Sequence, residues 1–133
     1  MSQIDLFATI LEAAEIEETA TLPTPSRSLM PLLQGRPFTW EDAVFMEQEE
    51  TRAIRTSRWL YMARFQGSPH NPFSDELYDL QNDPRERVNL LGDERVVGTA
   101  VTLRQRLHDF FDQYSDPRFD LWRLLRSRRG CAR

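Results

Sequence analysis

The sequence predicts an α+β fold: a small antiparallel sheet of three to four strands, packed by a long C-terminal helix and preceded by an N-terminal helix. Two observations predict it. Apolar residues recur at helical spacing near both ends of the chain, and short segments of alternating polarity lie between them. With 133 residues, 40% of them hydrophobic, the chain can bury a core of modest size in one domain.

The N-terminal segment predicts an amphipathic helix over residues 3–16. Its apolar stripe consists of Ile4, Phe7, Ile10, Leu11 and Ala14. Residues 17–25 are polar with two prolines, which predicts a loop. A short helical turn should follow around Leu29–Leu33 and stop at Gly35.

The middle of the chain predicts the strands. Residues 43–47 form a short apolar candidate, and residues 53–56 with 59–65 form a longer one. Alternation in the longer candidate places Tyr61 on one face and Leu60 on the other. Residues 67–74 predict a loop, and residues 76–80 another short strand.

The last predicted element is a helix over residues 93–114. Apolar residues recur there at alternating spacings of four and three, namely Val96, Ala100, Leu103, Leu107, Phe110 and Tyr114. Upstream, Asp83, Pro84 and Glu86 have the spacing of a capping box that begins a helix. A calcium loop using Asp79 and Asp83 is disfavoured, because calcium needs six or more oxygen ligands and no glycine turn follows.

Composition excludes several function classes. The net charge of −4 argues against general affinity for nucleic acids or anionic membranes, and no apolar run is long enough to span a bilayer. The N-terminus lacks the basic region of a secretory signal, so the sequence as written would be cytoplasmic. The chain has no Lys and a single Cys, Cys131, which excludes a Lys-based mechanism or an internal disulfide. The five Arg of residues 123–133 predict a solvated tail, with a phosphate- or sulfate-binding arm as the alternative.

Five segments together resemble the C-terminal part of the sulfatases. The run DELYDLQNDPRERVNL (75–90) is similar to that family's last strand and entry to its final helix, and TRAIRTSRWLYM (51–62) to the strand upstream. SQIDLFATILEAAEI (2–16), SRSLMPLLQG (26–35) and DPRFDLWRLLRSRRG (116–130) match further family segments in the same order. The resemblance implies a linking helix and loop over 1–36, a C-terminal α+β subdomain over 37–116 and an Arg-rich tail over 117–133.

One short motif resembles the sulfatase nucleophile site, C-x-P-S-R. Here PTPSR places Pro23 where the Cys would be. Proline has no nucleophilic atom, and the neighbouring SRSLMPLLQG match puts this stretch far downstream of the family's nucleophile. PTPSR is therefore interpreted as a chance resemblance to the motif that arises in a proline-rich loop.

The resemblance also implies that the catalytic equipment lies elsewhere. In sulfatases the formylglycine, the calcium ligands and the supporting His and Lys belong to a larger N-terminal α/β domain, which would precede Met1. We therefore assign no catalytic, cofactor-binding or metal-binding residue in this chain. His70, in a loop, and His108, expected to be exposed, are interpreted as non-catalytic. A reading frame begun too late, or a truncated or split gene, is the hypothesis for the start at Met1.

Several positions depart from the family pattern. Ala8 replaces a Pro, and Glu15 replaces a Gly, so the first helix should lose its left-handed cap. Leu60 replaces a common Lys, and Leu124 and Leu125 replace a Gly-Gly pair. The last two changes weaken the expectation that a restored full-length protein would be an efficient sulfatase.

The expected function is that of a C-terminal fragment of a sulfuric ester hydrolase. It should be inert alone and contribute to packing and to the substrate pocket in a complete enzyme, whose substrates could also be sulfamates or phosphonate esters. Its expected partners are the sulfatase catalytic domain or a second copy of itself. The alternative is a free-standing protein-interaction module, which would bind a partner through the helix at 3–16 and the Arg-rich tail.

Overall fold

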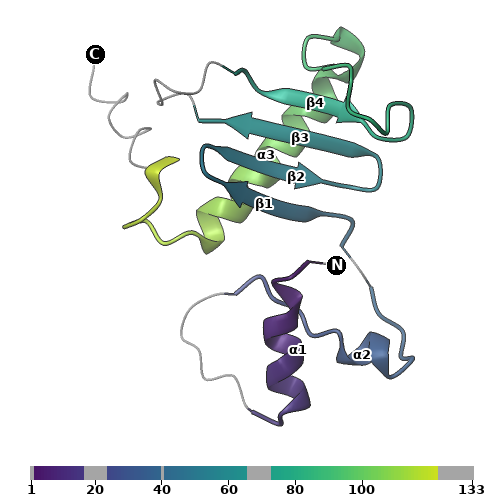
Figure 1. The fold of residues 1–133 in the computed structure, drawn as a ribbon, viewed down its shortest axis with the longest axis vertical. Coiled ribbons are helices and arrows are strands. Elements are labelled where there is room, and N and C mark those ends of the chain that lie inside the picture. The colour runs from purple at the N-terminus through teal and green to yellow at the C-terminus, as the bar shows by residue number, and fades with distance from the viewer. Residues whose placement is uncertain (1, 17–23, 40, 66–72, 123–133) are drawn as a thin grey trace. The chain divides into compact units, whose positions relative to one another are not determined.

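The computed structural model describes residues 2–16, 24–39, 41–65 and 73–122. The chain divides into two compact units, Met1–Val44 and Phe45–Arg133. Figure 1 shows the first unit with its helices α1 and α2, and the second with a four-stranded sheet and the long helix α3. The predicted α+β class, with its helix–sheet–helix order, is confirmed.

The first unit contains α1, Asp5–Ala13, and the single-turn helix α2, Met30–Leu33. Helix α1 is shorter than the predicted range of 3–16 because the chain turns at its C-terminus. Glu15 takes a left-handed φ of 55°, and the Ile16 amide donates to the Leu11 carbonyl at 3.0 Å. The predicted loss of the left-handed cap is therefore wrong: Glu15 adopts this conformation without being glycine, at a cost of roughly 1 kcal/mol.

The sheet has the order β1-β2-β3-β4, with strands Val44–Gln48, Thr51–Arg55, Trp59–Arg64 and Glu76–Asp79. The longer candidate predicted over 53–65 is two antiparallel strands, β2 and β3, in which Ile54 lies opposite Tyr61. Thr56 makes the turn between them, because its hydroxyl accepts from the Trp59 amide at 2.8 Å. Strand β4 pairs with β3 so that Leu77 lies opposite Tyr61.

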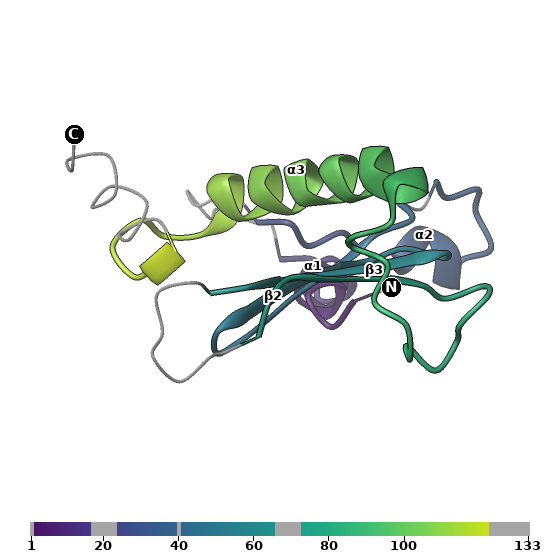
Figure 2. The same ribbon diagram turned by 90° about the horizontal axis from the view of Figure 1, so that it is seen from above.

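Helix α3, Val97–Tyr114, covers one face of the sheet, as Figure 2 shows from above. Its buried residues are Ala100, Leu103, Leu107 and Phe111. The predicted apolar stripe included Phe110, but the buried residue at this point of the helix is Phe111. Phe110 instead stacks on Phe45 of β1, with ring centroids 3.9 Å apart and planes 5° from parallel.

A 3-10 turn, Glu94–Val96, precedes α3 and is capped by Asp93, whose side chain accepts from the Arg95 amide. The capping box predicted at Asp83 is wrong, since no helix begins there. The Asp83 carboxylate closes a turn instead, accepting from the amides of Arg87 at 2.6 Å and Val88 at 2.9 Å. Glu86 has a φ of 55° and pairs with Arg55 at 3.4 Å. The same sequence pattern is compatible with a helix start and with a turn, because an Asp side chain accepts hydrogen bonds from free backbone amides in either setting.

Candidate functional site

In the part of the chain that the structure describes, no group of three or more His, Cys, Asp or Glu could hold a metal ion, and no helix could cross a membrane. His108 lies half-buried on α3, in contrast to the exposure expected from the sequence. Pro23, His70, Cys131 and most of the Arg-rich tail, including Leu124 and Leu125, lie outside the described residues.

Ser26 and Arg27, the last two residues of the PTPSR motif, have a structural role. The Ser26 hydroxyl donates to the Ile4 carbonyl at 2.7 Å and accepts from the Ala8 amide at 2.9 Å. The Arg27 amide donates to the Asp5 carboxylate at 3.2 Å. These contacts hold the loop against α1.

The first unit exposes several large hydrophobic side chains. Large hydrophobic side chains are exposed on α1 and its ends and on α2, namely Ile4, Leu6, Phe7, Ile10, Ile16, Leu32 and Leu33. Of the predicted stripe on α1, only Leu11 is half-buried. An exposed apolar area of this kind is typical of a surface that contacts another protein.

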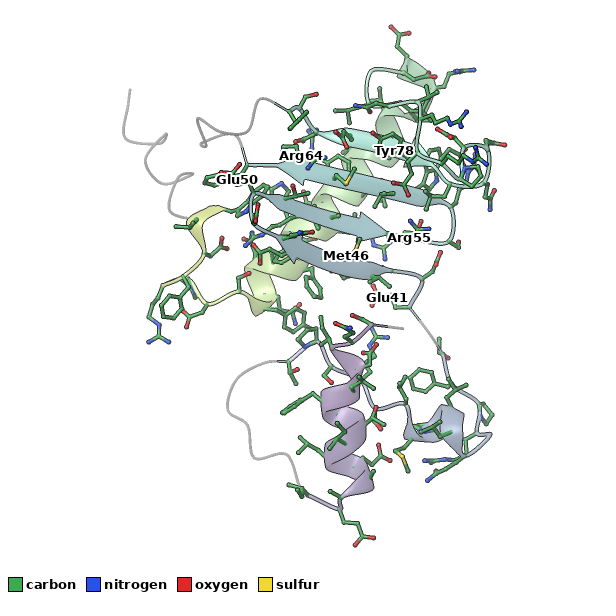
Figure 3. All side chains as sticks on the ribbon, viewed as in Figure 1. Glu41, Met46, Glu50, Arg55, Arg64 and Tyr78 are labelled. Atoms are coloured by element: carbon green, nitrogen blue, oxygen red, sulfur yellow. The ribbon has the colours of Figure 1, made fainter. Side chains whose placement is uncertain are left out.

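In the second unit, the face of the sheet opposite α3 carries charged and polar side chains as well as apolar ones. Figure 3 labels Met46, Arg55, Arg64 and Tyr78 on this face. Arg64 pairs with Glu76 at 3.0 Å across β3 and β4. Burial of Tyr78 raises the pKa of its hydroxyl. Arg55 pairs with Glu86 in the loop after β4 at 3.4 Å. Because these two arginines already have acidic partners, this face is a weaker candidate for an interaction surface than α1.

A polar network joins α3 to β3 on the covered face. The hydroxyl of the buried Tyr61 donates to Asp75 at 2.7 Å and accepts from the guanidinium of Arg104 at 2.8 Å. Burial raises the pKa of Tyr61 to about 12, and the hydrogen bond from Arg104 acts in the opposite direction. A tyrosine that holds its proton so firmly is suited to positioning α3 and is a poor general base near neutral pH.

A second buried cluster joins β2 to the segment after α3. The guanidinium of Arg52 contacts the carboxylate of Asp120 at 2.9 Å, and its Nε donates to Glu47 at 2.8 Å. The same guanidinium lies 4.1 Å from the Phe111 ring centroid and 5.1 Å from that of Trp122. Both segments belong to the family resemblance, but their side chains satisfy one another, so we interpret the cluster as structural.

Comparisons with known proteins assign the family. The family model for the C-terminal part of N-sulphoglucosamine sulphohydrolase matches residues 1–113. An uncharacterised sulfatase of Escherichia coli K12, YidJ, is 29% identical over 118 residues, which are 88% of this chain and 23% of the relative.

Solved structures agree. A Bacteroides thetaiotaomicron protein assigned to the sulfatases superposes with a TM-score of 0.67 at 28% identity, covering 88% of this chain and 26% of that one. A phosphonate monoester hydrolase of Agrobacterium radiobacter shares the fold, with a TM-score of 0.66 at 22% identity over 85% of this chain and 25% of its own. The chain thus spans about a quarter of the length of these relatives. It belongs to the N-sulphoglucosamine sulphohydrolase C-terminal family of the sulfatases.

Proposed function

We propose that this chain acts as the C-terminal part of a sulfatase and has no sulfatase turnover of its own. The observation that carries the proposal is the family match over residues 1–113, in a chain that spans about a quarter of its relatives. The chemistry of the residues supports it. A formylglycine nucleophile requires a Cys in the C-x-P-S-R motif, and the only Cys of this sequence, Cys131, follows Gly130 and precedes Ala132.

The calcium ion that the family uses does not fit the described residues. Calcium takes six to eight oxygen ligands, whereas the carboxylates that are buried among the described residues, those of Asp5, Asp79 and Asp120, already have hydrogen-bond or ion-pair partners. Asp79 pairs with Arg58 at 2.9 Å, and Asp120 pairs with Arg52. We therefore derive no hydrolytic step from these side chains.

In a complete enzyme the proposed contribution is packing and the shaping of the substrate pocket. Sulfate esters are the proposed substrate class, with sulfamates or phosphonate esters as related possibilities, since one fold supports several such chemistries. The family description and the phosphonate monoester hydrolase neighbour support this range. The comparisons do not favour a free-standing interaction module.

Two measurements test the proposal. The purified chain, free of host sulfatases, should release no nitrophenol from nitrophenyl sulfate above the buffer background. Turnover that scales with the concentration of the chain would contradict inertness. The DNA upstream of Met1 should encode, in frame or in an adjacent gene, a segment with the C-x-P-S-R motif. An unrelated promoter region at that position would argue against a role in a sulfatase.

A further inference from the structure

We propose that the outer edge of β1, Val44–Gln48, binds the Arg-rich tail of this chain, residues 123–133, as an added strand of the sheet. The tail itself lies outside the described residues. The inference goes beyond the proposed function, because a tail that closes the sheet edge would do so with or without the catalytic part of a sulfatase.

The two edges of the sheet differ in whether their backbone groups have partners. The strand order β1-β2-β3-β4 makes β1 and β4 the edges. The edge of β4 is covered, because the Leu90 amide donates to the Leu77 carbonyl at 2.8 Å and the Leu77 amide donates to the Asn89 side chain at 3.0 Å. Among the described residues, no backbone hydrogen bond of this kind reaches the outer side of β1. Such an edge is a template for a further strand.

The charge around this edge favours a basic segment. Residues 45–50 include Glu47, Glu49 and Glu50 and no basic residue. The side chain of Glu47 is 43% exposed even though it accepts from Arg52. Residues 123–133 contain five Arg and no acidic residue. Opposite charges on neighbouring strands stabilise their pairing, and like charges directly opposite destabilise it. The charge of the tail thus complements that of the edge.

The tail also begins close to β1. It follows Trp122, whose ring centroid lies 5.1 Å from the guanidinium of Arg52. Arg52 donates in turn to Glu47, near the C-terminal end of β1, at 2.8 Å. A tail that starts at this end and runs along the edge is antiparallel to β1, which is the direction that a short connection between paired strands allows.

The length of the tail is sufficient for this pairing. The five residues of β1 span about 17 Å as an extended strand. Residues 123–133 can extend over about 36 Å. Roughly half of the tail can therefore round the end of the sheet while the rest pairs with β1. The later part of the tail carries most of its positive charge, namely Arg126, Arg128, Arg129 and Arg133.

Amide exchange of β1 in the whole chain tests the proposal. Alternate amides of a strand point to opposite sides, so some β1 amides face β2 and the others face the outer edge. The outward amides should be protected in the parent chain, where they should exchange at least about tenfold more slowly than in the double variant Ser127→Pro with Arg128→Pro. Adjacent prolines remove an amide donor from the tail in either register. The amides that face β2 should stay protected in both proteins, which shows that the sheet remains folded.

A pair of matched variants separates the effect of charge from that of the backbone. The triple variant Arg126→Gln, Arg128→Gln and Arg129→Gln should lower the protection of the outward amides. The triple variant with Lys at the same three positions should keep most of this protection, because it retains the positive charge. Raising the salt concentration should act on the parent chain in the same direction as the Gln variant, since salt screens exposed charges.

Three results would overturn the proposal. The first is that the outward amides of the parent chain exchange at the rate of an unstructured peptide. The second is that their protection persists unchanged in the proline variant, because the edge would then be covered by something other than the tail. In that case, a dimer detected by light scattering would identify a second copy of the chain as the occupant. The third is equal protection in the Gln and Lys variants, which would contradict the match of charge between the tail and the edge.

Discussion

Removing the carboxylate of Asp120 should destabilise the second unit by about 3 kcal/mol. Asp120 lies after α3 and Arg52 in β2, so the pair joins two segments that are 68 positions apart. The Nη2–Oδ1 distance is 2.9 Å, and a longer contact of 3.5 Å joins Nη1 to Oδ2. The substitution Asp120→Ala would leave the guanidinium of Arg52 without this partner.

The magnitude follows from the burial of both side chains. The side chain of Arg52 is 4% exposed and that of Asp120 is 1% exposed. Truncating one partner of a buried ion pair typically costs about 3–5 kcal/mol, because the remaining charge is desolvated without compensation. The value should lie at the lower end of this range, since Glu47 still accepts from Arg52 at 2.8 Å and is itself half-exposed.

Asp116→Ala is a matched control for local geometry. Asp116 accepts from the Arg118 amide at 2.9 Å, and Asp120 accepts from the Trp122 amide at 3.0 Å. In both cases the carboxylate accepts from the amide two residues further along the chain, so the local geometry is the same. The ion pair of Asp116 with Arg118 is exposed to solvent and should contribute little to stability. The difference between the two variants therefore reports the buried pair.

Urea melts followed by tryptophan fluorescence would measure both variants, provided that the slope with denaturant is unchanged. A cost for Asp120→Ala no larger than that for Asp116→Ala would refute the reasoning. A further check is the double replacement Arg52→Met with Asp120→Leu. It should recover most of the loss, because an apolar pair leaves no uncompensated charge in the interior.

Three further predictions concern the second unit. Leu107→Ala should lower the free energy of unfolding by about 2–5 kcal/mol, because Leu107 is the part of α3 that is buried in the core. Asp83→Ala should lower it by only about 1 kcal/mol, through the loss of its hydrogen bonds in the turn. Equal midpoints of the two variants in urea would show that α3 does not face the core. The folded state keeps the proton of Tyr61 up to about pH 12, above the ordinary tyrosine pKa of 10.0, so stability should fall as pH rises through this window. Urea melts at increasing pH should show this fall in the parent and a smaller one in Tyr61→Phe. The hydrogen bond from Arg58 lowers the pKa of Asp79, so its contribution is present above the ordinary carboxyl pKa and lost as pH falls. Asp79→Asn should make acid unfolding less steep, and an unchanged acid transition would contradict that role.

The α+β class, the order of the elements and the family resemblance all follow from the amino-acid sequence. Leu103 and Leu107 share one side of a helix because the spacing of side chains is set by the helix itself. Alternation likewise placed Tyr61 and Leu60 on opposite faces of β3 before any partner strand was known. Such features depend on neighbours within a few residues, so local pattern is enough to predict them. The same holds for the absence of a C-x-P-S-R nucleophile, which is a property of the chain's composition.

The tertiary structure alone decided the features that depend on distant partners. Nothing in the spacing of α1 shows that Asp5 and Thr9 are buried by the loop at Ser26–Leu29, and this loop decides which side of the helix remains exposed. The pairing of Arg52 with Asp120 was equally hidden, since it joins segments that only the packing of α3 brings together. Hydrogen bonds and ion pairs between remote residues leave no periodic trace in a sequence. The spacing therefore predicted the apolar stripe of α1, whereas the burial of the polar side with Asp5 and Thr9 was seen only in the structure.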